Sequence, residues 1–167
     1  MRWLIDGYNV IRRDTDLRGH EAESLEAGRA ALIHLVARKA RESRDDFTLV
    51  FDGARVTGGA PSPGRVRVLF SRPPRTADDE LIRLARQHGA GAVVVSSDRK
   101  IQDAARRSRC GAVTAEQFLA GVTERAEPGL ETRDEEDDRP REKRGNPRKL
   151  SRKARAAQRA LRRLRPS

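Results

Sequence analysis

The chain has 167 residues, of which 37% are charged and 36% hydrophobic, enough for one ordinary domain and a tail. Its single cysteine, Cys110, excludes an internal disulfide framework and a cysteine-rich zinc site. The start of the chain, with an aspartate at its sixth residue, lacks the apolar core of a signal peptide. The longest uncharged apolar run, Ala90–Val95, is far shorter than the ~20 residues of a membrane span. We therefore expect a cytoplasmic protein without a membrane partner.

The net charge of +11 is unevenly distributed along the chain. Residues 1–120 carry 21 basic and 16 acidic side chains, a net charge of +5. Residues 121–138 have a net charge of −6, and residues 139–167 have a net charge of +12. Segregated charge blocks are typical of tails and linkers. We predict a domain over 1–121, an acidic disordered linker over 122–138 and a basic, partly helical tail over 139–167.

The predicted elements alternate along the domain. Apolar runs predict strands over 3–5, 47–51, 66–70, 92–95 and 111–114, the first of which ends in a turn at Asp6-Gly7. Periodicity and capping signals predict helices over 25–41, 76–88, 99–108 and 115–121. In the first helix, Leu25, Leu32, Ile33 and Val36 share an apolar face. Residues 57–64 have the composition of a loop. This alternation predicts a parallel α/β sheet with helices on both faces.

Three of the predicted strands are followed by an aspartate: Asp6, Asp52 and Asp98. The carboxyl ends of parallel strands share one edge of the sheet, and a further pair, Asp78 and Asp79, begins a predicted helix. Carboxylates so close repel one another by roughly 1 kcal/mol or more per pair, unless a cation neutralises them. Oxygen ligands without Cys or His favour Mg²⁺ or Mn²⁺, ions suited to phosphodiester hydrolysis. The alternative is that each aspartate is an ordinary turn residue or helix cap.

Four segments carry a family resemblance. They are Ile5–Ile11 (IDGYNVI), Leu49–Asp52 (LVFD), Thr76–Ile82 (TADDELI) and Val95–Gln102 (VSSDRKIQ). In this order they resemble the YacP-like branch of the NYN domains, which belongs to the PIN-like metal-dependent nucleases. The resemblance covers roughly residues 2–119. It implies a three-layer α/β/α PIN-like fold with a central, mostly parallel sheet, and an endoribonuclease that uses a divalent metal. One bacterial member is a ribosome-dependent mRNA endoribonuclease, so the resemblance also implies ribosome association as an expectation to test.

The resemblance implies roles for individual residues by position. Asp6, Asp78 and Asp98 would be the catalytic carboxylates that hold Mg²⁺ or Mn²⁺. Asn9 would complete the catalytic set by hydrogen-bonding a ligand water or a carboxylate. Asp52 would be an additional acid at the rim of the site. Asp79 competes with Asp78, which we favour because it occupies the aspartate position of Thr-Ala-Asp.

Basic residues flank these motifs. Arg99 and Lys100 follow Asp98 directly and are predicted to contact RNA phosphates, with a solvated helix start as the alternative. Arg12 and Arg13 depart from the family pattern, where a smaller and less charged turn is expected. They are predicted to add phosphate contacts or to narrow the site.

Three further side chains have alternative interpretations. Ser96 and Ser97 could hydrogen-bond the carboxylates or RNA, and Ser97 could equally be only the N-cap of the following helix. Tyr8 is expected in the core, with stacking on an RNA base as the alternative.

The tail has its own pattern. Leu150, Ala154, Ala157, Leu161 and Leu164 recur at steps of four and three, a narrow apolar stripe on a basic helix. An isolated helix of ~15 residues is marginal, so we expect it to fold on a partner. Its charge favours RNA, with ribosomal RNA as one candidate, and binding that weakens steeply with salt. The alternatives are an anionic membrane surface and a solvated tail.

The sequence thus favours a metal-dependent endoribonuclease acting on RNA, with mRNA as the expected substrate. One alternative is a non-catalytic RNA- or ribosome-binding module with the same fold. Another is a metal-dependent phosphatase on a different α/β fold, which the missing Asp-x-Asp motif at the first strand disfavours. The pattern predicts no oligomeric state.

Overall fold

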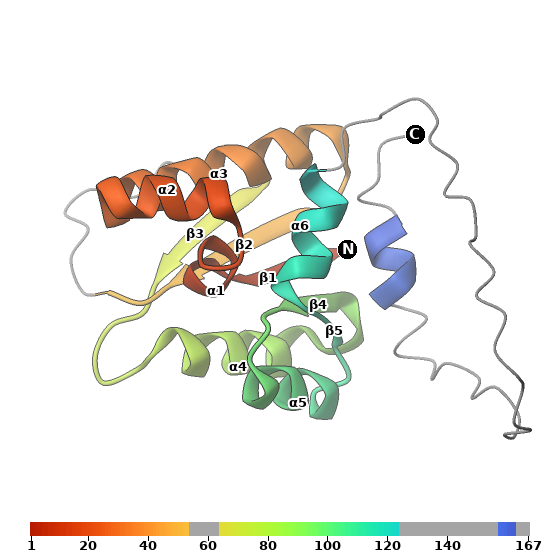
Figure 1. Ribbon diagram of the computed structural model, residues 1–167. Helices are drawn as coiled ribbons and strands as arrows, with labels where there is room; N and C mark the ends of the chain where they lie inside the picture. Colours follow the sequence, from red (N-terminus) through yellow and green to blue (C-terminus); the bar gives the residue numbers. More distant parts are fainter. Residues whose placement is uncertain (54–63, 124–156, 163–167) are drawn as a thin grey trace, which may run out of the picture.

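The computed structural model describes residues 1–53, 64–123 and 157–162 (Figure 1). The strands are β1 (Arg2–Asp6), β2 (Asp46–Phe51), β3 (Val66–Phe70), β4 (Ala92–Val95) and β5 (Gly111–Val113). The helices are α1 (Gly7–Ile11), α2 (Thr15–Glu23), α3 (Leu25–Glu42), α4 (Ala77–His88), α5 (Arg99–Arg107) and α6 (Ala115–Thr123), and a 3₁₀ turn (Gly89–Gly91) follows α4. Residues 157–162 are also helical. Across the described ranges, every helix is too short or too polar to cross a membrane.

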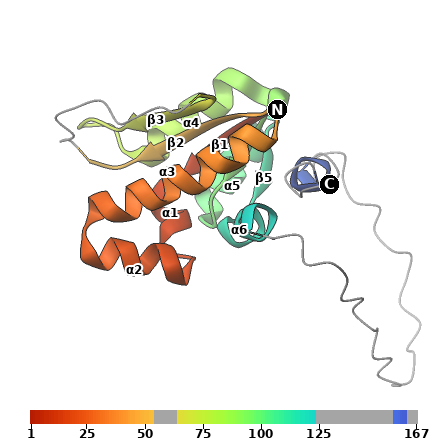
Figure 2. The ribbon, with the colours of Figure 1, turned by 90° about the horizontal axis from the view of Figure 1, so that it is seen from above.

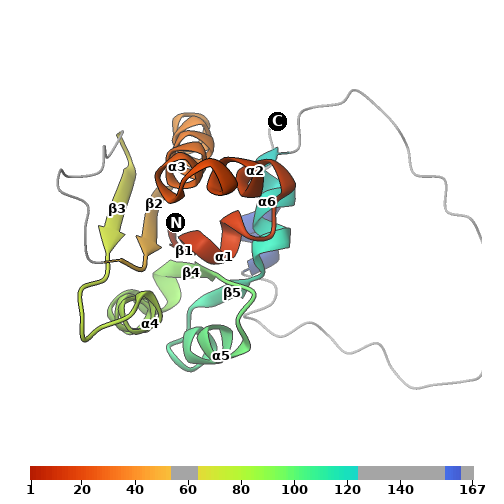
Figure 3. The same cartoon turned by 60° about the vertical axis from the view of Figure 1, so that its left-hand side comes forward.

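The five strands form one parallel sheet in the order β3-β2-β1-β4-β5. Successive side chains of a strand point to opposite faces, so Trp3 and Ile5 of β1 join one buried cluster and Leu4 joins the other. Helices α1, α2, α3 and α6 lie over the first face, and α4 and α5 lie over the second (Figure 3). The predicted three-layer α/β/α architecture is confirmed.

The predicted elements are confirmed for all five strands and for α3, α4, α5 and α6, to within two residues at each end. The turn predicted after β1 is wrong, because α1 begins at Gly7. Helix α2 was not predicted, since Leu17 is its one buried side chain and an apolar period is missing. Leu25 is 53% exposed, contrary to its predicted place on the apolar face, whereas Leu32 and Val36 are fully buried. As the first residue of α3, Leu25 lies at the end of the helix and outside the core.

Several predicted segments fall outside the described residues. Of the predicted loop over 57–64 the structure describes Gly64, and of the predicted linker it describes residues 122–123, which belong to α6. Of the basic tail it describes 157–162, which lie on the α6 side of the molecule (Figures 1 and 2). Ala157 and Ala160 are buried in the same cluster as residues of β1 and α6. This part of the tail therefore packs on the domain itself.

Candidate functional site

The carboxyl edge of the sheet brings the predicted acids together. Asp6 ends β1, the middle strand, while Asp52 and Asp98 follow the two strands beside it, β2 and β4. The chain runs from β1 outward to β2 and β3, then crosses to β4 on the other side of β1. Such a reversal of strand order is where open α/β sheets place their ligand sites.

Asp6 is held from both sides. Its Oδ1 accepts the backbone N–H of Asn9 at 3.2 Å, and its Oδ2 accepts the Ser96 hydroxyl at 2.9 Å. Burial raises the pKa of Asp6, these two hydrogen bonds partly offset the rise, and the negative charges of Asp78 and Asp52 add to it. The carboxyl at the centre of the edge is therefore half-buried, and two further aspartates act on it electrostatically.

Asp52 anchors the first turn of α4 to the end of β2. Its Oδ1 accepts both the Ser71 hydroxyl at 2.7 Å and the backbone N–H of Ala77 at 2.6 Å. These bonds place the N-terminus of α4 beside the sheet edge. Asp52 thus has a structural function as well as a place among the acids.

The two neighbouring aspartates of α4 have different surroundings. The pKa of Asp78 is raised first by burial and then by the nearby charge of Asp98, while Lys100 lowers it. Asp79 is exposed and forms a capping box, in which its Oδ2 accepts the backbone N–H and the hydroxyl of Thr76, both at 3.1 Å. Those hydrogen bonds lower the pKa of Asp79. Asp78 is accordingly the one engaged electrostatically with the other acids.

Asp98 begins α5. Its Oδ1 accepts the backbone N–H groups of Lys100 at 2.6 Å and of Ile101 at 3.3 Å, so Asp98 is the N-cap. The alternative in which Ser97 caps this helix is wrong. The Ser97 hydroxyl instead donates to Glu116 at 2.7 Å and accepts the backbone N–H of Ala115 at 3.1 Å, which joins it to the start of α6.

The Asn9 side chain bonds the backbone and not a carboxylate, while its bond to a ligand water stays a prediction. Its side-chain oxygen accepts the backbone N–H of Ser97 at 2.8 Å, and the bond to the Asp6 carboxylate comes from the Asn9 backbone. The side chain therefore ties the turn after β4 to α1. It positions the acids and does not itself bond one.

The predicted RNA-binding cations have different surroundings. Lys100 is close enough to Asp78 to lower its pKa. Arg13 pairs with Glu116 at 3.3 Å. Arg99 is exposed in the first turn of α5.

Ser96 is fully buried and its hydroxyl donates to the Asp6 carboxylate, which confirms the interpretation that it hydrogen-bonds an acid of the site. One residue of this edge, Glu116, is absent from the predicted site. Glu116 lies in the first turn of α6, directly after β5. The sequence pattern that could have identified Glu116 is an acidic residue shortly after a predicted strand, the same pattern that identified Asp6, Asp52 and Asp98.

The donor chemistry of the edge fits a hard divalent cation. Carboxylate oxygens are the ligands that Mg²⁺ and Mn²⁺ prefer. A cation would favour the charged carboxylates against the burial that chiefly raises the pKa values of Asp6 and Asp78, and against the repulsion that adds to it. Within the residues that the structure describes, no three His, Cys, Asp or Glu side chains form a group that could hold a metal ion. The acids share an edge and influence one another without making a ready ligand shell.

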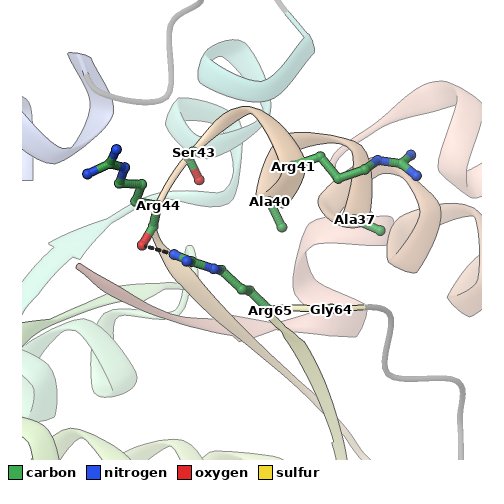
Figure 4. A pocket seen from close by; sticks show the side chains of 7 residues that line it. All are labelled: Ala37, Ala40, Arg41, Ser43, Arg44, Gly64 and Arg65. Carbon is green, nitrogen blue, oxygen red and sulfur yellow. Dashed lines mark hydrogen bonds between the residues drawn. The ribbon is translucent and has the colours of Figure 1, made fainter.

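A separate pocket of about 500 Å³ lies at the opposite end of the sheet (Figure 4). Arg41, Arg44 and Arg65 line it, and Arg65 Nη1 donates to the carbonyl oxygen of Arg44 at 2.6 Å. Since α3 ends and β3 begins here, the pocket contains none of the acids and is not part of the site.

Comparison with known proteins gives consistent matches. The family profile of the YacP-like NYN domain matches residues 3–163, a range that includes the predicted linker and most of the tail. The uncharacterized protein YacP of Bacillus subtilis (strain 168) is 33% identical over 84 residues, which are 49% of each chain, so the match spans about half of that relative. The crystal structure of Rae1 (YacP) from Bacillus subtilis has a TM-score of 0.63 and 29% identity, over 73% of both chains. The crystal structure of a point mutant of Rae1 from Bacillus subtilis also has a TM-score of 0.63, with 27% identity over 73% of this chain and 74% of that chain.

Proposed function

The chain belongs to the YacP-like NYN domain family, and from that premise we propose that it is a divalent-metal-dependent endoribonuclease that hydrolyses RNA phosphodiester bonds. The family and its PIN-like, nuclease-type fold indicate a function related to RNA. The observation that carries the finer proposal is that Asp6, Asp52 and Asp98 follow neighbouring strands at one edge of the sheet, with Asp78 close enough to interact with them. Burial raises the pKa of Asp6 and of Asp78, and the charges of Asp78 and Asp52 on Asp6, and of Asp98 and Asp52 on Asp78, raise it further. An edge so charged is suited to binding a cation.

In this proposal Asp6, Asp78 and Asp98 hold Mg²⁺ or Mn²⁺. The bound ion would supply positive charge to the phosphate and lower the pKa of an attacking water. Ser96 and Asn9 keep the acids in place through the hydrogen bonds described above. The ammonium of Lys100 balances part of the negative charge of the phosphate.

The decisive experiment compares two adjacent aspartates of the same helix. Cleavage of single-stranded RNA by the full chain is measured with Mg²⁺, with Mn²⁺ and with EDTA. We expect Asp78→Asn to lose about 100-fold or more of the activity, a typical size for a group that acts in the reaction. Asp79→Asn, the matched control, should lose little, because its carboxylate bonds Thr76. Cleavage that persists in EDTA, or in the double variant Asp6→Asn with Asp98→Asn, would refute the proposal.

A second candidate is a non-catalytic RNA-binding module. One observation favours it: Asp6, Asp52 and Asp98 each use Oδ1 to accept a backbone N–H, as ordinary caps and anchors do. RNA binding without cleavage, whichever metal is added, would select this candidate.

We further propose a cytoplasmic enzyme that acts on mRNA and contacts ribosomal RNA through its basic tail. The support is the net charge of +12 in residues 139–167. Deleting the whole tail would also remove Ala157 and Ala160 from the core, so charge substitution is the cleaner test. Arg159→Gln with Arg162→Gln, both at exposed positions, should weaken sedimentation with ribosomes and flatten its salt dependence. Unchanged sedimentation would contradict a role of these charges.

A further inference from the structure

A row of three aromatic rings crosses the same end of the sheet as the acids. Tyr8 of α1 meets Phe51 of β2 edge to face, with ring centroids 5.3 Å apart. Phe51 stacks on Phe70 of β3 at 5.8 Å and an interplanar angle of 25°. Phe51 is fully buried, while Tyr8 and Phe70 are half-buried. Tyr8 follows Asp6 by two residues and Phe51 directly precedes Asp52, so the row adjoins the acids.

Each outer ring of the row lies under a guanidinium group. Arg12 is 5.8 Å from the centroid of Tyr8, and Arg29 is 5.5 Å from the centroid of Phe70. The Arg12 side chain is 68% exposed, and its ion pair with Glu21 is long, at 4.0 Å. Arg12 can therefore move off the ring at small cost. Positive charge over a partly exposed ring is the pairing with which proteins hold unpaired nucleotides, the ring for the base and the cation for the phosphate.

The packing beneath the row leaves Tyr8 half-buried. An added Cβ at Gly7 would overlap the Phe51 ring, so Phe51 occupies the space directly under the start of α1. Tyr8 is half-buried: it packs against the buried cluster, as expected of a core residue, but is not fully enclosed by it. The buried Phe51 gives the two half-buried rings a rigid support.

We propose that Tyr8 and Arg12 bind an unpaired base of the RNA substrate beside the acidic edge, and that Phe70 and Arg29 receive a second base. The choice of RNA as ligand rests on the proposed function. The inference adds where the chain holds an unpaired base, since the faces of a base in a duplex are covered by its neighbours. The ring row selects unpaired bases, and the acids act on the adjoining phosphate.

The test measures binding without cleavage, on the full chain carrying Asp78→Asn and in the presence of EDTA. The probes are a short RNA containing 2-aminopurine and an abasic strand of equal length and charge. We expect the base-containing strand to bind about 5- to 100-fold more tightly, with quenching of the 2-aminopurine fluorescence. Tyr8→Leu should remove this preference, and Tyr8→Phe, which retains a ring, should keep it.

Equal binding of the two strands would overturn the inference, and this comparison needs no change at Tyr8. A Tyr8→Leu variant with an unchanged circular dichroism spectrum and an undiminished preference would overturn it as well. The outcome is separable from that of the proposed function. A chain that prefers the base-containing strand but never cleaves RNA supports base binding by Tyr8 and refutes the nuclease proposal. A chain that cleaves RNA without this preference supports the nuclease proposal and refutes base binding by Tyr8.

Discussion

The Ser96 hydroxyl donates to Oδ2 of Asp6 across 2.9 Å and joins the end of β4 to the end of β1. The oxygen of the Ser96 hydroxyl also accepts the backbone N–H of Asp98 at 3.1 Å. Ser96 is fully buried, so water cannot take the place of either bond. One hydroxyl therefore fixes two of the three acids proposed to hold the metal.

Ser96→Ala should destabilise the fold by about 1–3 kcal/mol, the usual effect of leaving a buried polar group unsatisfied. It should also raise the pKa of Asp6 further, because the lost hydrogen bond is one that lowers it. We expect activity to fall about 10- to 100-fold, as when a group that orients metal ligands is removed. Urea unfolding and the pH dependence of RNA cleavage check both effects. Ser97→Ala is the control for the pH profile, because the Ser97 hydroxyl bonds Glu116 and the backbone N–H of Ala115 and not Asp6. An unaltered pH profile in Ser96→Ala would contradict the assignment.

Asp6→Asn should stabilise the metal-free protein at neutral pH while abolishing cleavage. The pKa of Asp6 is raised in the folded state, so between about pH 3.9 and that raised value the folded protein holds a proton that the unfolded chain releases. Stability therefore falls as the pH rises through this range. Urea unfolding in EDTA from pH 4 to 7 should show a shallower fall for Asp6→Asn than for the wild type. An equal fall in both proteins would show that Asp6 does not contribute.

Added Mn²⁺ should restore stability to the wild type at neutral pH. Binding to the folded state alone contributes about 2.7 kcal/mol at a free concentration of one hundred times Kd. The shift in thermal unfolding should be lost in Asp78→Asn and retained in Asp79→Asn. A shift of equal size in both variants would place the metal elsewhere.

Asp52→Ala should destabilise the protein by about 1–3 kcal/mol, because the N–H of Ala77 and the hydroxyl of Ser71 lose their shared acceptor. Asp52→Asn keeps an oxygen at Oδ1 and should lose less. If Asp52 is mainly an anchor, Asp52→Asn retains most of the cleavage activity. A loss as large as that of Asp78→Asn would make it a member of the catalytic set.

Arg109→Gly should stabilise the protein by about 1 kcal/mol. Arg109 follows α5 with φ of 65°, a left-handed conformation in which a side chain is strained. Its backbone N–H bonds the carbonyl of Arg106 at 3.1 Å, so the conformation is held by the end of the helix. Thermal unfolding measures the gain, and Arg109→Ala, which keeps a Cβ, should show none. A Gly variant no more stable than the Ala variant would contradict this explanation.

Ala160→Gln should destabilise the domain by about 1–3 kcal/mol, since Ala160 is fully buried in the cluster on the α6 side of the sheet. Arg159→Gln introduces the same side chain at the adjacent exposed position and should change stability little. Equal urea midpoints for the two variants would show that this helix does not contribute to the stability of the domain.

Local patterns in the sequence were sufficient to predict most elements. The apolar runs predicted the strands. Capping signals helped to predict the starts of α3 and α4, where Ser24 and Thr76 are the N-caps, since such signals depend on residues within one or two turns. The preference for Asp78 over Asp79 also had an unused local signal, because Thr76 and Asp79 have the three-residue spacing of a capping box. Helix α2, with Leu17 as its one buried side chain, left no such pattern.

By itself, the sequence determined that acids follow the strands of an α/β domain. The tertiary structure decided which groups those acids bond. Ser96 and Asp6 are 90 residues apart and become neighbours through the pairing of β4 with β1. It likewise turned the Asn9 side chain to the backbone of Ser97 and placed the half-buried Tyr8 edge to face with Phe51. Strand order sets these contacts, and strand order depends on the burial of both faces of the whole sheet, which no short stretch of residues specifies.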